Sequence, residues 1–311
     1  MGSSFERLRT FGYEGKAVSD WKAISHCSMS IREKLKNYFE LNGFELALRL
    51  TLLDLLLRPI GYWEIRPFVL TLAVIAFLLP NQVRNPVIWF ALSFLTGLRV
   101  ILDWPLSDNH AYLLCYWCLA ISSSLISKDG ENCLKLNGRV LIGLAFAYAV
   151  LWKLALSPDY LDGRFFKITM LTDSRFESFT QLIGALTPEQ MEELRYFISQ
   201  HVDGQILQSQ EIPNQPERFV LASQMLTYST LVLEGLVALS FLWPLRKGIS
   251  KIRDIFLIFF CITTYALATV QGFGWLLIAM GVAQTDPDRW KTRLAYIAVY
   301  LLIIFYREIP W

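Results

Sequence analysis

Residues 218–243 read RFVLASQMLTYSTLVLEGLVALSFLW, an apolar run with a single acidic residue, Glu234, near its centre. A run of this length can cross the hydrocarbon core of a membrane as an α-helix, which needs about 20 residues. Seven further apolar runs are separated by polar connectors: 44–58, 67–80, 86–103, 110–127, 139–156, 252–271 (extendable past Gly272 to 283) and 293–306. The pattern predicts an all-α polytopic membrane protein, a bundle of about eight transmembrane helices, with a range of seven to nine.

The composition agrees with this class. Of 311 residues, 54% are hydrophobic, and a formal net charge of only +2 gives no indication of nucleic-acid binding. Several of the runs are shorter than about 20 residues, and the first carries Arg49 and Asp54. Such segments are expected to pack against protein or to extend through their flanks.

The chain divides into two parts. Residues 1–43 are mixed and polar without a secretory signal, and they are predicted to be a cytoplasmic N-terminal segment. Within them, residues 31–42 place Ile31, Leu35 and Phe39 along one helical face with basic neighbours, which predicts an amphipathic helix lying at the membrane interface. Residues 44–311 form the predicted transmembrane domain.

Lysine and arginine set the expected orientation. Residues 1–43 carry seven of them, and the connectors 128–139 and 244–253 are basic, whereas 157–217 carries ten acidic residues against four basic ones. Because basic connectors stay cytoplasmic, both chain ends are predicted to be cytoplasmic and 157–217 extracytoplasmic. We expect an integral multi-pass protein of a bacterial inner or internal membrane.

The connector 157–217 is the only sizeable piece outside the runs, and it is predicted to be a small extracytoplasmic helical insertion. Thr187 followed by Pro188 is a helix-start signal, with the threonine as N-cap and the proline in the first turn. The predicted helix continues to about residue 200. An insertion of this size can cover the mouth of a cavity as a lid.

Two residues carry the expected chemistry. His110 opens one apolar run and Lys153 lies near the end of the next, so antiparallel runs bring both to the extracytoplasmic side. Ionisable side chains at apolar depth are costly and mark functional sites. With Asn109, they are predicted to line one cavity.

These residues belong to a longer pattern. Asp103 precedes Asn109-His110-x-Tyr112, and Trp152-Lys153-Leu154 is followed by Asp159-Tyr160-Leu161-Asp162-Gly163. The pattern resembles the membrane core of the vitamin K-dependent gamma-glutamyl carboxylase and its bacterial relatives, the horizontally transferred transmembrane (HTTM) domain family. The resemblance covers roughly residues 44–290.

The resemblance implies that Lys153 is the base that deprotonates a reduced quinone, with His110 and Asn109 positioning the substrate or stabilising charge. Burial disfavours the charged ammonium and so makes a neutral amine available. Substrate contact is expected from four further residues: Asp103, Tyr112, Trp152 and Glu234. The implied cofactor is a quinone or another lipid-soluble molecule, and no metal is expected because no second histidine or glutamate lies at ligand spacing.

Two departures from the family limit the expectation. The family has a histidine about ten residues before the glycine matched by Gly272, where this chain reads Cys261-Ile-Thr-Thr-Tyr265. The carboxylase also has a large lumenal domain that holds its protein substrate, and only 157–217 is present here. Carboxylation of peptide glutamate is therefore not expected.

Structural explanations compete with these roles. Lys153 can extend to the membrane interface and His110 can cap its helix. Asp103 can pair with Arg99 one turn earlier, and Glu234 can be the buried partner of a base such as Lys153 or Arg49.

The sequence therefore favours a carboxylase-like integral membrane protein that handles a quinone- or isoprenoid-type molecule, with catalysis preferred over binding alone. The alternatives are a non-catalytic subunit or assembly factor of a larger membrane complex, and a lipid- or pigment-binding module. Expected partners are membrane lipids, a hydrophobic small molecule and other membrane protein subunits.

Overall fold

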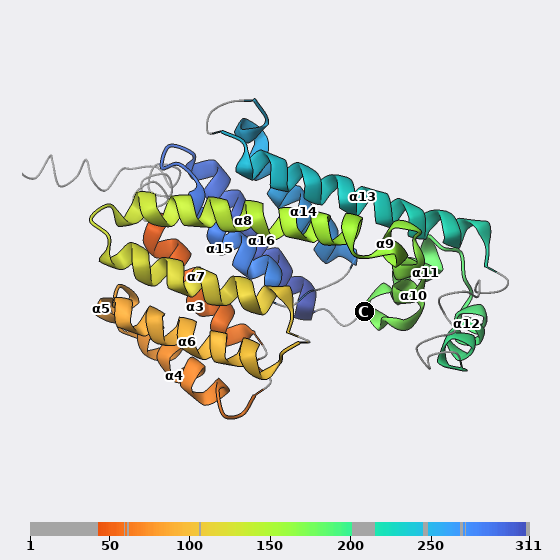
Figure 1. Ribbon diagram of the computed structural model, residues 1–311, viewed down its shortest axis with the longest axis horizontal. Coiled ribbons are helices and arrows are strands. Elements are labelled where there is room, and N and C mark those ends of the chain that lie inside the picture. Colours follow the sequence, from red (N-terminus) through yellow and green to blue (C-terminus); the bar gives the residue numbers. More distant parts are fainter. Residues whose placement is uncertain are drawn as a thin grey trace, which may run out of the picture.

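The structure is a computed structural model that describes residues 43–58, 60, 62–105, 107–200, 215–244, 248–267, 270 and 272–308. The described residues fold into helices without a strand, which confirms the all-α class (Figure 1). The predicted interfacial helix 31–42 lies outside the described residues.

Nine helices of the described chain form the bundle: α3 (Gly43–Leu57), α4 (Arg66–Leu78), α6 (Pro86–Leu102), α7 (Asn109–Ile126), α8 (Gly130–Ala155), α13 (Glu217–Leu242), α14 (Arg253–Leu267), α15 (Phe273–Gln284) and α16 (Trp290–Glu308). The short helix α5 (Pro80–Val83) joins α4 to α6, and η2 (Gly248–Ile252) precedes α14. Most bounds lie within three residues of the predicted runs, but α8 begins nine residues before 139.

The run starting at 252 is divided into two helices. Gly272, with φ +86°, stands between α14 and α15, and the chain reverses there. At the other end of this helix pair, Arg253 of α14 donates to Gln284 of α15 (2.7 Å). Tyr306, near the end of α16, donates to Ala266 near the end of α14 (3.2 Å).

This extra helix bears on the expectation that both chain ends are cytoplasmic, which stays a prediction. Gly43, the first residue of α3, packs against Arg293 in the first turn of α16. Since α16 then runs away from that point, the start of α3 and the end of α16 lie at opposite ends of the bundle. Nine bundle helices in place of eight add one reversal of the chain, and the additional helix, α15, begins after Gly272.

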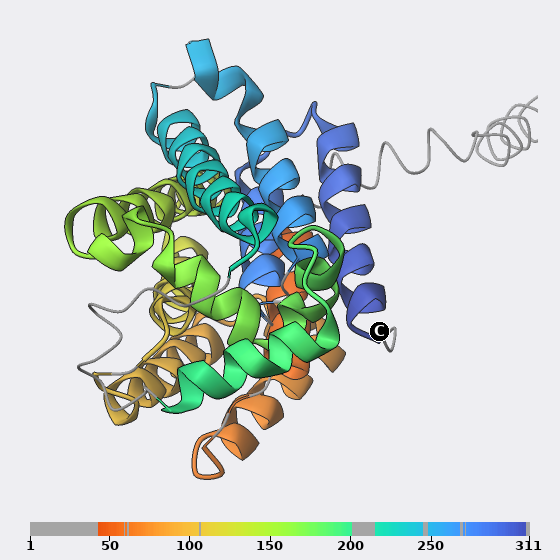
Figure 2. The same cartoon turned by 90° about the vertical axis from the view of Figure 1, so that its right-hand side faces the viewer.

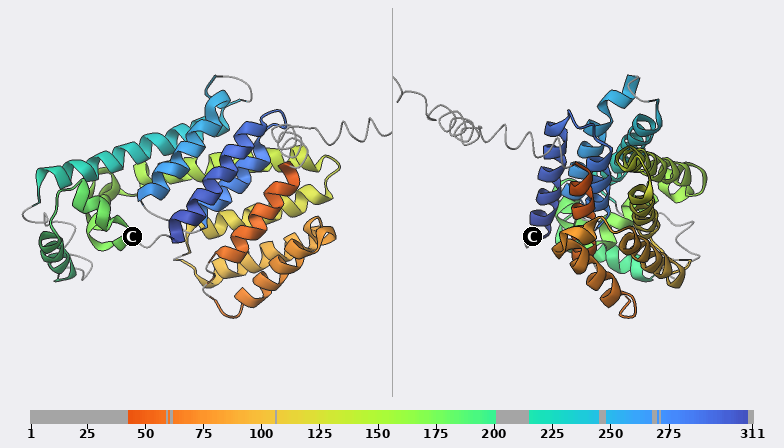
Figure 3. Two further views of the ribbon diagram at one scale, coloured as in Figure 1. Left: turned by 180° about the vertical axis from the view of Figure 1, so that it is seen from behind. Right: turned by 90° about the vertical axis from the view of Figure 1, so that its left-hand side faces the viewer.

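The core centres on α15, which is apolar all round and almost completely buried. It packs against α3, α8 and α16, and Tyr300 of α16 donates to the Leu50 carbonyl of α3 (3.1 Å). Figure 3 shows α16 and α3 side by side on the face away from α13. A helix without a polar face needs protein or lipid on every side, and here protein covers it.

The insertion folds into a helical cap with its own apolar cluster. Its elements are α9 (Pro158–Leu161), α10 (Arg164–Thr172), η1 (Ser174–Phe176), α11 (Glu177–Leu182) and α12 (Pro188–Gln200). They pack on the first half of α13 through Phe219, Ala222 and Leu226 (Figure 2). We call the end of the bundle that carries it the cap end.

The predicted start of α12 is confirmed. The Gln190 amide donates to Thr187 Oγ1 (3.3 Å), while the Thr187 amide donates to the Gln190 side chain (3.0 Å). This reciprocal pair is a capping box, which satisfies two backbone donors at a helix N-terminus.

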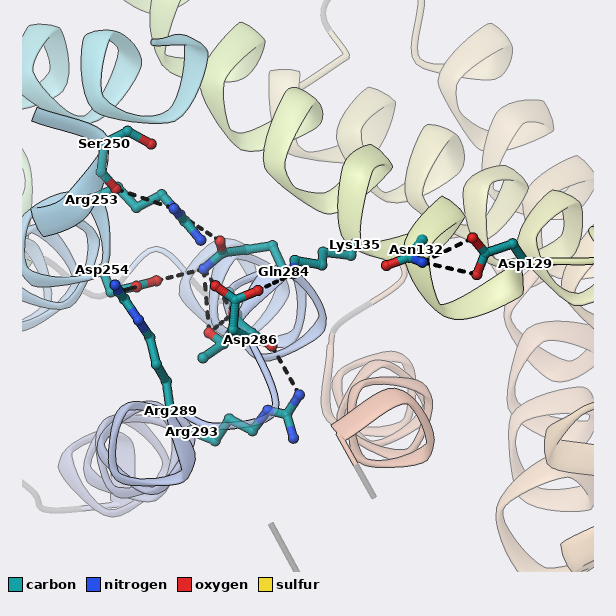
Figure 4. A network of polar contacts seen from close by, with 12 residues as sticks. Asp129, Asn132, Lys135, Ser250, Arg253, Asp254, Gln284, Asp286, Arg289 and Arg293 are labelled. Carbon is teal, nitrogen blue, oxygen red and sulfur yellow. Dashed lines mark hydrogen bonds and ion pairs between the residues drawn. The ribbon is translucent and has the colours of Figure 1, made fainter. Parts of the chain in front are cut away.

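A polar network holds the opposite end together (Figure 4). Gln284, fully buried, accepts from Arg253 and donates to Asp254 (2.5 Å), which ties α15 to α14. Lys135 of α8 forms an ion pair with Asp286 in the turn before α16. We call this the basic end.

Two helices of the described chain, α8 and α13, are long and apolar enough to cross a membrane, judged by length and composition alone. Helices α4, α6 and α15 are apolar but shorter. Because core helices of soluble proteins have the same composition, the pair indicates membrane association only weakly.

Candidate functional site

A cavity of about 690 Å³ lies between α13 and α14 and extends to the cap. Most of its lining is apolar, and Phe166 of α10 and Phe176 of η1 contribute from the cap. We call it the α13–α14 groove. Its full lining is Phe166, Phe176, Leu226, Tyr228, Ser229, Thr230, Val232, Leu233, Glu234, Leu236, Phe259, Phe260, Thr263, Thr264 and Leu267.

The spacing of residues on the two helices explains the groove. On α13, Leu226, Thr230 and Leu233 recur at intervals of three and four residues, so they share one helical face. On α14, Phe260 and Thr264 do the same. Two of the lining hydroxyls are satisfied on their own helix: Ser229 donates to the Leu226 carbonyl (3.2 Å) and Thr263 to the Phe259 carbonyl (2.9 Å).

Glu234 brings a carboxylate into this apolar wall, and Lys153 neutralises it. The Lys153 ammonium donates to both carboxylate oxygens, at 2.5 and 2.6 Å. Only 9% of the Glu234 side chain and 18% of the Lys153 side chain are exposed. The alternative that Glu234 is the buried partner of Lys153 is thus confirmed, whereas Arg49 pairs with Glu45 (2.6 Å).

Tyr160 of α9 covers the same ammonium. Lys153 Nζ lies 4.8 Å from the centre of the Tyr160 ring, a distance at which the ring quadrupole attracts a cation. Three elements, α8, α9 and α13, therefore meet at one charged group. Tyr160 lies near Lys153 because α8 ends at Ala155 and the first helix of the cap, α9, begins only three residues later at Pro158.

His110 belongs to a separate row of packed aromatic rings. Its ring stacks on Phe273 at a centroid distance of 4.1 Å. Phe273 faces Phe146 (6.3 Å), and Phe146 meets Phe260 of the groove edge-on (4.7 Å). The histidine thus connects to the far side of the groove wall through aromatic packing.

The predicted meeting of His110, Asn109 and Lys153 in one cavity stays a prediction. Within the described part of the chain, no hydrogen bond, ion pair or ring contact joins His110 to Lys153. Asn109 is exposed and Tyr112 half-buried, while Trp152 is 60% exposed. None of these five residues contributes to the lining of the α13–α14 groove.

Asp103 has the structural role that the sequence offered as an alternative. It accepts a hydrogen bond from Tyr62 (2.6 Å) and lies 3.4 Å from Arg99 Nε one turn earlier. The carboxylate thereby joins the end of α6 to the turn before α4.

Sequence reasoning missed a second buried ion pair. Arg58 donates to Asp54 (2.8 Å) and to the Gly272 carbonyl (2.5 Å), and both charged side chains are almost fully buried. The spacing of an acid and a base four residues apart in an apolar run was the available signal. The Arg58–Asp54 pair joins the end of α3 to the turn before α15, close to His110.

No group of three potential metal ligands from histidine, cysteine, aspartate and glutamate occurs in the residues that the structure covers. In comparisons with known proteins, no family model, no curated protein and no solved structure matches this chain.

Proposed function

We propose that this chain is a carboxylase-like integral membrane protein that binds a lipid-soluble molecule, of quinone or isoprenoid type, in the α13–α14 groove. The observation that carries the proposal is the single ion pair, Lys153–Glu234, at the wall of an otherwise apolar groove. A pocket for such a ligand needs apolar surface for the tail and a few polar groups for the head.

The outer faces of the bundle support a membrane location. Helices α4 and α6 present large apolar side chains outward, among them Phe68 (62% exposed), Phe94 (65%) and Val87 (70%). In water, the exposure of so many large apolar side chains is unfavourable, whereas lipid tails cover them. Trp63 and Trp104, at the cap end, are exposed by 77% and 71%, as in the aromatic belts of membrane interfaces.

The helices of the bundle differ in length, which is compatible with a membrane location if protein surrounds the short ones. Helix α13, with 26 residues, is about 39 Å long, whereas α15, with 12 residues, is about 18 Å. A short helix at membrane depth is tolerated where protein surrounds it, and α15 is enclosed by α3, α8 and α16. We therefore propose nine crossings.

Charge supports an orientation with the N-terminus cytoplasmic. The connectors at the basic end carry most of the lysines and arginines outside the helices, and the acidic insertion lies at the opposite end. By the positive-inside rule the basic end faces the cytoplasm. With nine crossings, the C-terminus then faces the other side.

For catalysis at the Lys153–Glu234 pair, we propose roles that differ from those implied by the sequence. While the pair is closed, the Lys153 amino group is engaged with both carboxylate oxygens of Glu234, so it is not available to a ligand as a base. We propose that Glu234 accepts the proton of a ligand hydroxyl and that the Lys153 ammonium stabilises the oxyanion that remains. Should the pair open, Lys153 itself takes the role of base.

The alternative, a binding module or a non-catalytic subunit, is favoured by the lining of the groove. Apart from Glu234, Tyr228 is the only titratable residue among the described lining residues. A groove with so few titratable side chains can hold a lipid or pigment without transforming it.

Filling the groove tests binding. We expect Leu233→Trp to abolish binding of a labelled decyl-benzoquinone to the detergent-purified protein, because the indole occupies the ligand's space. Leu239→Trp is the matched control, since Leu239 is 54% exposed on the same helix and does not line the groove. Equal binding by both variants would refute the assignment of the groove.

Substitution of Lys153 tests catalysis. Guanidinium cannot act as a base but preserves the charge beside Glu234. Lys153→Arg and Glu234→Gln are compared for rescue of the phenotype of a deletion strain. Rescue by Lys153→Arg alone supports Glu234 as proton acceptor, failure of both supports base chemistry at the pair, and rescue by both favours the binding module. Co-purification of a stable complex in mild detergent would favour the subunit.

A further inference from the structure

Tyr160 carries an unused polar group next to the groove. Its side chain is only 4% exposed, and its hydroxyl makes no hydrogen bond of ordinary length and angle to the described residues, although the Thr230 side chain is close enough to hydrogen-bond with the phenol. A buried hydroxyl without a partner is costly, which calls for a reason to keep it. The face of the ring is already used by the Lys153 ammonium, but that contact needs no hydroxyl.

The neighbours of Tyr160 belong to the groove wall. Its ring centre is 5.6 Å from that of Phe166, which lines the groove from the cap. Two lining residues act on the phenol, Glu234 through its charge and Thr230 through a side-chain hydrogen bond. Tyr160 is not itself a lining residue, but its hydroxyl lies beside Thr230, which is one.

The phenol is held in its donor form. Burial raises the pKa of Tyr160 well above its ordinary value, the Glu234 carboxylate raises it further, and Thr230 opposes this only in part. The raised pKa favours the protonated phenol, which can donate a hydrogen bond.

The charges around the groove indicate which kind of ligand oxygen can accept a hydrogen bond from Tyr160. Lys153 and Glu234 neutralise each other, and no lysine or arginine occurs among the described lining residues. A phosphate or carboxylate head group would find no free positive charge there, and burying an uncompensated anion is unfavourable. An uncharged carbonyl oxygen needs only a donor.

We propose that the Tyr160 hydroxyl donates a hydrogen bond to an uncharged oxygen of the molecule bound in the groove, and so makes Tyr160 the residue that selects neutral head groups. The inference rests on the proposed binding function of the α13–α14 groove. It assigns the cap a part in ligand recognition besides covering the groove.

Tyr160→Phe tests this inference, because it removes the hydroxyl and retains the ring over Lys153. Three probes are compared on the detergent-purified protein: decyl-benzoquinone, decylbenzene, which lacks the oxygens, and decyl phosphate. We expect the variant to bind the quinone about threefold to tenfold more weakly, which is the effect of one hydrogen bond, and decylbenzene unchanged. Decyl phosphate should bind neither protein. Tyr196→Phe, on the exposed face of α12, is the control and should leave all three unchanged.

The outcomes separate this inference from the proposed function. If the wild-type protein binds neither the quinone nor decylbenzene, the groove assignment itself fails. If it binds the quinone and Tyr160→Phe binds it equally well, or loses both probes equally, the role of the hydroxyl is refuted while the groove stands. Preferential binding of decyl phosphate would refute selection for neutral head groups. Folding is checked by thermal unfolding, in which Tyr160→Phe should be at least as stable as the wild type.

Discussion

At Gly272 the backbone and a buried arginine require the same residue type. The φ of +86° favours glycine, and a Cβ there would lie 2.5 Å from Arg58 Cζ. The Arg58 guanidinium in turn donates to the Gly272 carbonyl and to Asp54. A single turn between two helices thus depends on an ion pair from α3, far away in the sequence.

We therefore expect Gly272→Ala to lower the free energy of unfolding by about 2 kcal/mol or more, the sum of left-handed backbone strain and a displaced arginine. Gly235→Ala is the control. A Cβ at Gly235, inside α13, meets nothing within 4 Å, so alanine should be neutral or stabilising through its helix propensity. Thermal unfolding in detergent measures both, and equal midpoints would contradict the expectation.

The Lys153–Glu234 pair also has consequences for stability. Removing one partner of a buried pair leaves an uncompensated charge, and the typical cost is about 3–5 kcal/mol. Lys153→Met should therefore destabilise strongly, whereas Lys153→Met with Glu234→Leu should recover most of the loss. This double-mutant cycle is read from denaturant unfolding. Additive effects of the two substitutions would show that the pair is not formed.

At the scale of elements, Lys135 and Asp286 join α8 to the turn between α15 and α16. Partial burial acts to raise the pKa of Asp286, but the hydrogen bond and the positive charge of Lys135 outweigh it, helped by Arg253 and Arg289, so the pKa lies below its ordinary value. A carboxylate with a lowered pKa stabilises the fold above the ordinary carboxyl pKa. That stability is lost as the pH falls through the folded pKa.

The lowered pKa of Asp286 predicts how the stability of the fold changes with pH. Asp286→Asn should lower the unfolding midpoint at pH 7, by an amount corresponding to no more than about 1 kcal/mol because the pair is partly exposed. The difference from the wild type should shrink as the pH falls below the ordinary carboxyl range, where the wild-type aspartate is protonated too. A difference that is constant between pH 7 and pH 3 would exclude this ion pair as its cause.

At the scale of the whole molecule, the proposed topology predicts which surfaces can be reached from outside intact cells. Lys251, at the basic end, and Glu189, on the cap, are both exposed. In a chain whose own cysteines are replaced by serine, a cysteine at position 189 should react with an impermeant thiol reagent and one at 251 should not. Reaction at 251 alone would reverse the orientation, and reaction at both would exclude a membrane-spanning bundle.

The sequence by itself determined the helices, because apolar runs and their polar ends are local properties. The runs 86–103 and 218–243 became α6 and α13 almost residue by residue, and Thr187 marked the start of α12 correctly. The run 252–271 ended directly before Gly272, but residues up to 283 were expected only as an extension of that run, not as the separate helix α15. What imposes the break at Gly272 is tertiary: Arg58 binds the Gly272 carbonyl from another helix.

Only the tertiary structure decided which candidate residues meet. From the sequence, Lys153 had several possible partners, and hydrophobic periodicity does not rank them because it carries no information on how helices are arranged around the bundle. Packing of α8 against α13 selected Glu234, and the chain reversal into the cap placed Tyr160 over the same ammonium. His110, nearer in sequence, instead stacks on Phe273 of the central helix, because aromatic packing there buries its ring.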